Sequence, residues 1–131
     1  MSAWKRLFWG IGLWAFSNGF ASDVLDLSRM NSTILFAKLY EISQSAEEYK
    51  GKTFRMKGYY ELAKDEIDGK KYHVLLLSDA AACCNFSFEM EWDAHEKIPK
   101  KGSQVTVEGI FNPIFEEHMI IPQLKKTRIV P

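Results

Sequence analysis

Residues 53–61 read TFRMKGYYE, and their side chains alternate between two sets. One set is Phe54, Met56, Gly58 and Tyr60, and the other is Thr53, Arg55, Lys57 and Tyr59. A period of two places successive side chains on opposite faces, which is typical of a β-strand with one buried face. The glycine in the middle of this strand predicts a bulge or a sharp bend.

Four more strands are expected, over 72–78, 85–92, 104–111 and, for the last one, 118–121 together with 124–130. The first of these is almost entirely apolar, which is typical of a central strand covered on both faces. The next two alternate between apolar and polar side chains, and Gly109 is a second mid-strand glycine. Pro122 interrupts the last strand. Asp68-Gly69 predicts a tight hairpin turn before residue 72.

The segment before the strands predicts a helix over about residues 32–50. Its apolar side chains recur at spacings of four and three residues, namely Leu35, Leu39, Ile42, Ala46 and Tyr49. Asn31 is a good N-cap candidate because its side chain can accept a hydrogen bond from the first turn. Ser45 and Glu48 have the spacing of a capping box, so the helix is expected to break near Ser43 and restart as one turn.

One helix followed by five strands predicts a mainly β fold. We expect a five-stranded, OB-like Greek-key barrel preceded by an N-terminal helix, because mid-strand glycines let long strands coil around a small barrel. A small β-sandwich and an SH3-like barrel are the alternatives. Residues 22–131 would form this single domain, and the stretch 22–29 has no clear element of its own.

Residues 1–21 have the pattern of a signal peptide. Lys5 and Arg6 precede an uncharged run over 7–16, and Gly19 and Ala21 stand at the −3 and −1 positions of a cleavage site before Ser22. The alternatives are an uncleaved anchor and an amphipathic first helix. Cleavage would leave an exported protein, periplasmic or extracellular, with no stable membrane span.

The charge balance disfavours nucleic acid as a partner. The chain has 17 Lys and Arg against 17 Asp and Glu, and the two charges in residues 1–21 are both basic, so the processed chain would have a net charge of −2. Nucleic-acid-binding domains usually carry an excess of basic residues. The strand over 85–92 adds Glu89 and Glu91 to its polar face, and carboxylates there would repel phosphate.

The sequence resembles a group of small exported bacterial proteins that have an OB-like domain. Residues 30–33, 49–53, 56–58 and 101–109 follow the pattern of the group. The stretch 78–84, which reads SDAAACC, supplies its most specific part, Asp-Ala-x-x-Cys-Cys. The resemblance covers about residues 27–130. Many members are lipoproteins of unestablished function, whereas this chain lacks the cysteine that would be lipidated. A similar paired-cysteine element occurs in the OB-like C-terminal domain of a membrane protein family that accompanies permeases. The resemblance implies a fold and a compartment, and no activity.

Cys83 and Cys84 admit three interpretations. They could pack as small buried residues where the barrel closes, or form a strained, easily reduced vicinal disulfide in an oxidising compartment. They could also bind zinc or copper, with His73, His118 or the oxygen of Asp79 completing the ligand set. A metal-binding or thiol-redox protein is therefore the alternative function. A buried, hydrogen-bonded role is the competing interpretation of His73.

The ligand surface of an OB barrel is the outer face of its second and third strands with the adjoining loops. Lys57, Tyr59 and Tyr72 would form a polar and aromatic patch on this face, and Glu89 and Glu91 would face the same side. This composition favours a neutral or cationic ligand. The sequence contains no hydrolase motif and no phosphate-binding glycine loop, so we expect a non-catalytic binding or accessory module of the bacterial cell envelope. Its partner would be an envelope protein or a small ligand.

Overall fold

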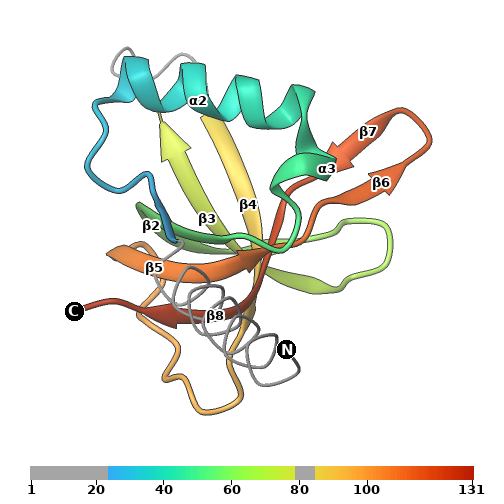
Figure 1. The fold of residues 1–131 in the computed structure, drawn as a ribbon. Coiled ribbons are helices and arrows are strands. Elements are labelled where there is room, and N and C mark those ends of the chain that lie inside the picture. Colours follow the sequence, from blue (N-terminus) through green and yellow to red (C-terminus); the bar gives the residue numbers. More distant parts are fainter. Residues whose placement is uncertain (1–23, 79–84) are drawn as a thin grey trace, which may run out of the picture.

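The computed structural model describes residues 24–78 and 85–131, and it shows a β-barrel with a helix across one end (Figure 1). The elements follow one another as β1 (Val24–Asp26), α2 (Ser32–Gln44), α3 (Ala46–Tyr49), β2 (Thr53–Lys64), β3 (Lys71–Ser78), β4 (Asn85–Trp92), β5 (Gln104–Phe111), β6 (Ile114–Glu116), β7 (Met119–Ile121) and β8 (Gln123–Ile129).

The barrel is closed by five strands in the order β2-β3-β4-β8-β5, with β5 returning to pair with β2. Neighbouring strands are antiparallel except β4 and β8, which are parallel. Three consecutive strands, a long connection and a last strand inserted between the third and fourth give the Greek-key topology of the OB type. The predicted fold class is therefore confirmed.

Gly58 lies where β2 changes partners. Residues 53–59 of β2 pair with β5, and residues 59–64 pair with β3. A Cβ atom at Gly58 would lie 2.6 Å from the carbonyl oxygen of Leu76 and 3.0 Å from Cγ of Leu75. The two strands cross too closely at this seam for any side chain, which is the physical reason for the predicted bend.

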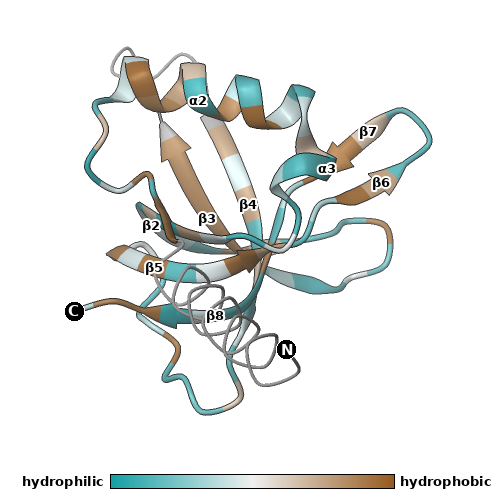
Figure 2. Cartoon of the chain, viewed as in Figure 1, coloured by the Kyte–Doolittle hydropathy of each residue, from teal (hydrophilic) through white to brown (hydrophobic). Residues whose placement is uncertain are grey.

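The core fills the inside of the barrel and extends to the inner face of α2. Figure 2 shows apolar residues along β3 and on α2. All the residues of the predicted helical face are buried or half-buried. Asn31 caps α2 by accepting a hydrogen bond from the backbone N–H of Ile34 at 2.9 Å. The break falls at Ser45, two residues later than predicted, and the Ser45 side chain makes no capping hydrogen bond.

Two expectations about the strands were wrong. The stretch after residue 22 does contain an element, β1, which pairs in parallel with the start of β2. The predicted start of the last strand at His118 belongs instead to a separate hairpin, in which β7 pairs with β6. This hairpin leaves the barrel in the connection between β5 and β8 (Figure 1). The apolar residues of this hairpin give the sequence pattern of a barrel strand, although several of their side chains are exposed.

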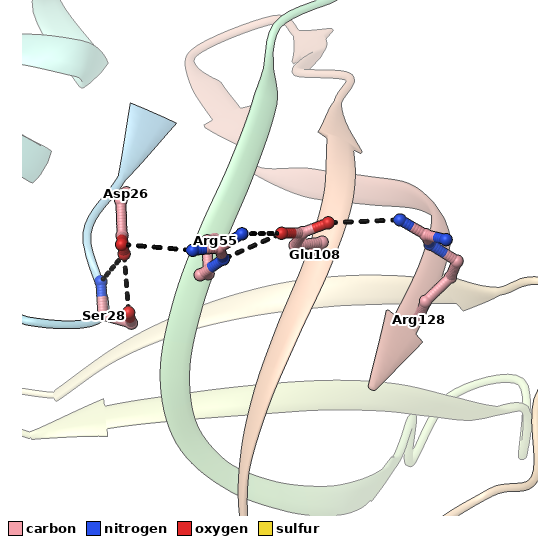
Figure 3. Close-up of polar contacts among 5 residues, drawn as sticks. All are labelled: Asp26, Ser28, Arg55, Glu108 and Arg128. Atoms are coloured by element: carbon pink, nitrogen blue, oxygen red, sulfur yellow. Dashed lines mark hydrogen bonds and ion pairs between the residues drawn. The ribbon is translucent and has the colours of Figure 1, made fainter. Parts of the chain in front are cut away.

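A row of alternating charges crosses four strands on the outside of the barrel (Figure 3). Arg55 on β2 donates to Asp26 on β1 at 3.4 Å and, through Nε, to Glu108 on β5 at 2.8 Å. Glu108 also accepts from Arg128 on β8 at 3.2 Å. The pKa of the Asp26 carboxyl is lowered, mainly by hydrogen bonds from Ser28 and also by the charge of Arg55. The row ties the short β1 strand to the barrel through its side chains.

The predicted signal peptide, residues 1–21, lies outside the described residues. Within residues 24–78 and 85–131, the helices fall short of the length and apolar character needed to cross a membrane.

Candidate functional site

The outer face of β2, β3 and β4 is the surface that OB barrels use for ligands. The strand register sets its side chains in rows. Tyr72 on β3 pairs with Ala63 on β2, and Val74 on β3 stands between Glu61 on β2 and Glu89 on β4. The loop over residues 65–70 borders one end of this face.

Tyr72 is a half-buried residue on β3 that is influenced by nearby carboxylates. Burial raises the pKa of its hydroxyl, and the negative charges of Asp68, Asp65 and Glu89 raise it further. Asp65 and Asp68 belong to the tight turn between β2 and β3, where Asp65 Oδ1 accepts from the backbone N–H of Ile67 at 2.8 Å. The turn thus places two carboxylates just before β3, the strand on whose outer face Tyr72 stands.

Glu89 is a half-buried acidic residue on β4. Burial raises the pKa of its carboxyl, and the charge of Glu116 adds to that increase. Glu116 comes from the β6–β7 hairpin, and the backbone N–H of Glu89 donates to the carbonyl of Pro122 at the end of that hairpin, at 3.0 Å. The hairpin thus brings a second carboxylate to the ligand face. We name Asp65, Asp68, Tyr72, Glu89 and Glu116 the acidic group.

Glu89→Gln is expected to stabilise the protein at neutral pH. The pKa of Glu89 is higher in the folded chain than its ordinary value of 4.5, so ionising it costs folding free energy. This cost grows as the pH rises through the folded pKa and remains at about pH 7, whereas glutamine does not ionise. Thermal unfolding should give a higher midpoint for the variant at about pH 7, with the difference shrinking toward about pH 4.

Glu91→Gln, at an exposed carboxylate on the same strand, is the control. Equal midpoints for Glu89→Gln and the parent chain at about pH 7 would contradict the burial of a charge.

The structure separates the predicted ligand residues into two places. Tyr72, Glu89 and Glu91 lie at the end of the face that is bordered by the loop over residues 65–70. Tyr59 pairs with Leu76, four residues along from the pair of Tyr72, which is about 13 Å of strand. Lys57 lies a further two residues away, next to Gly58. Lys57 and Tyr59 therefore do not form one patch with Tyr72.

Sequence reasoning did not find Asp65, Asp68 and Glu116 as site residues. The turn signal at Asp68-Gly69 placed the first two next to the strand that carries Tyr72, so they could have been found. Nothing in the sequence relates Glu116 to Glu89, because their proximity depends on the parallel pairing of β4 with β8.

His73 lies inside the barrel, at the end away from α2. Its Nδ1 is 2.7 Å from the Tyr60 hydroxyl, and its ring stacks on that of Tyr60 with centroids 5.8 Å apart. Trp92 packs edge-on against both rings, and its buried Nε1 has no hydrogen-bond partner among the residues that the structure describes. The structure thus gives His73 the hydrogen-bonded role that competed with metal binding.

The predicted metal and redox residues Cys83, Cys84 and Asp79 lie outside the described residues. His118, the other histidine considered as a ligand, is exposed on the β6–β7 hairpin. In the part of the chain that the structure describes, no three His, Cys, Asp or Glu side chains gather as a metal site would require. The zinc or copper site stays a prediction about residues 79–84.

Comparison with known proteins supports the fold. No family model matches the chain, and no curated protein matches it. Among solved structures, the chain is similar to a "putative nucleic acid-binding lipoprotein" from Klebsiella pneumoniae subsp. pneumoniae MGH 78578. The similarity covers 79% of this chain and 92% of that chain, with a TM-score of 0.53 and 18% sequence identity. At this identity the likeness shows a shared fold. The similar protein is described as a lipoprotein, as are many members of the group that the sequence resembles.

Proposed function

We propose that the chain is an exported, non-catalytic binding or accessory module of the bacterial cell envelope, and that it binds cationic ligands at the acidic group. The observation that carries the proposal is the position of Tyr72 among Asp65, Asp68 and Glu89 on the ligand face of an OB barrel. An ammonium or guanidinium group would relieve the repulsion between these carboxylates and could stack on the tyrosine ring. The lipoprotein identity of the similar structure supports an envelope location.

The β6–β7 hairpin favours a ligand that also has an apolar part. Phe115 is 48% exposed and Met119 is 59% exposed, and both flank Glu116 and Glu117. Exposed apolar side chains beside carboxylates are complementary to a polypeptide segment in which basic and apolar residues alternate. We therefore infer that the partner is a basic segment of an envelope protein, and that small cations bind more weakly.

Nucleic acid is a poor ligand for this face. The similar lipoprotein is described as nucleic acid-binding. Such binding normally depends on basic residues that contact phosphates and on aromatic residues that stack on bases. Here the aromatic Tyr72 is present, but the charges nearest to it are negative. A phosphate backbone crossing the acidic group would be repelled.

Calorimetric titration tests this function with three probes: spermidine, an amidated peptide that alternates lysine and leucine over six residues, and single-stranded deoxythymidine decamer. The peptide is expected to bind most tightly and more weakly at higher salt. The double variant Glu89→Gln/Glu116→Gln should weaken the peptide about tenfold, since each lost charge pair is worth up to about 1 kcal/mol.

Glu47→Gln/Glu48→Gln is the matched control, because it removes two exposed charges from α3. The peptide should bind this control as it binds the parent chain. Equal loss of peptide binding in both double variants would show that overall charge and not the acidic group is responsible. Tight binding of the decamer would contradict a ligand face that repels phosphate.

A further inference from the structure

A hollow lies at the end of the barrel face away from the acidic group, next to the start of α2. β1 pairs with residues 53–55 of β2, and β3 pairs from residue 59 onward, so the same edge of β2 is uncovered between them. The connection from β1 runs beside the barrel to the start of α2 (Figure 1), and its residues Leu27, Ser28 and Met30 line the hollow. The result is a cavity of about 260 Å³. Gly58 is one of the residues in its wall.

The cavity is amphipathic. Leu27, Leu35 and Leu76 give it an apolar lining, and Ser32 and Gln104 add polar groups. Lys57 supplies the one charge among the described residues that line it. Within the described part of the chain, Lys57 takes part in no ion pair, and its side chain is exposed. Lys57 is therefore the residue of this lining that can form an ion pair with a ligand.

We propose that this cavity binds a small carboxylate that carries a short apolar tail. The carboxylate pairs with the Lys57 ammonium, and the tail lies against Leu27, Leu35 and Leu76. The volume is just below the range of about 300–1,000 Å³ that holds drug-sized molecules, so the ligand is smaller than these. A charge-assisted hydrogen bond supplies the selectivity for an anion over a neutral or cationic analogue.

This site is separate from the proposed function, because it lies elsewhere on the barrel and binds ligands of the opposite charge. The acidic group selects cations at the hairpin end of the face, whereas the cavity selects anions about 20 Å away along β2, six residues from the pair of Tyr72. Either site can exist without the other, and the Lys57 variants below leave the acidic group intact.

Octanoate, octanol and octylamine are the probes, because they share a tail and differ in the charge of the head group. Titration of the full-length chain, followed by nuclear magnetic resonance, should show saturable octanoate binding, with octanol about tenfold weaker and octylamine weaker still. Lys57→Met should weaken octanoate about tenfold and leave octanol unchanged, and Lys57→Arg should restore octanoate binding.

Lys64→Met is the control, because Lys64 is exposed on the same strand and does not line the cavity. Octanoate should bind this control as it binds the parent chain. Three results would each overturn the proposal: no saturable octanoate binding, an equal affinity in Lys57→Met, or octylamine bound as tightly as octanoate. Lys57 is exposed, so unfolding does not explain a loss in the variant, and an unchanged thermal midpoint verifies this.

Discussion

Phe111→Ala is expected to destabilise the protein by about 3–5 kcal/mol, the cost of emptying a large aromatic site in a packed core. Phe111 is 2% exposed, and its ring stacks on that of Phe54 with centroids 4.7 Å apart. Phe88 lies against its other side, at 6.2 Å. The ring thus joins β2, β5 and β4 inside the barrel. Since small domains have only about 5–15 kcal/mol of stability, the loss would be a large part of the total.

Urea unfolding measures this effect, and the chain offers a control of the same residue type. Phe115 is 48% exposed on the β6–β7 hairpin, so Phe115→Ala should change the free energy of unfolding by less than about 0.5 kcal/mol. Similar losses for the two variants would mean that the strand assignment around residues 104–116 is wrong.

Gly58→Ala is expected to cost about 3 kcal/mol, at the upper end of the penalty for an overpacked position. The added methyl group would meet the Leu76 carbonyl oxygen at 2.6 Å. Because a backbone atom is in the way, rotation of a side chain cannot relieve the clash. β2 and β3 would have to separate at the point where β2 turns from one side of the barrel to the other.

The neighbouring residue gives the comparison for this variant. Lys57 faces outward on the same strand and is exposed, so Lys57→Ala should change the free energy of unfolding by less than about 1 kcal/mol. If Gly58→Ala is as stable as Lys57→Ala, then β2 and β3 do not cross as closely as described, and the seam is not where the barrel bends.

Local patterns in the sequence predicted most of the barrel. Alternation over residues 53–61 identified the buried face of β2, with Phe54 and Met56 inside. The spacing of Leu35, Leu39 and Ile42 identified the face of α2 that meets the barrel. These predictions succeeded because burial of one face imposes a period on residues that are close in the sequence.

Features that depend on distant pairings could not be predicted in this way. β1 has three residues and no pattern of its own, and it exists because β2 and Arg55 hold it. The β6–β7 hairpin has apolar side chains that face solvent, so its pattern was attributed to a buried strand. The charges of Arg55 and Glu108 are 53 residues apart and meet through the strand register.

The sequence predicted which side chains lie on the outer face of the barrel, but not which of them lie close together. Tyr72 and Glu89 were correctly placed on the outer face, because strand alternation determines which way a side chain points. Glu116 was missed, because the connection that carries it folds back as a hairpin. Alternation places Lys57 and Tyr59 on the same face as Tyr72, but about 13–20 Å of strand separates them from it, and this distance depends on the strand register.

The most direct test of the proposed function is to map the lysine–leucine peptide onto the protein by amide chemical shifts. We expect the shifted resonances to be those of residues 65–72, of Glu89 and its neighbours on β4, and of the β6–β7 hairpin. Shifts gathered instead on the charged row of Asp26, Arg55, Glu108 and Arg128, or spread evenly over the surface, would contradict it.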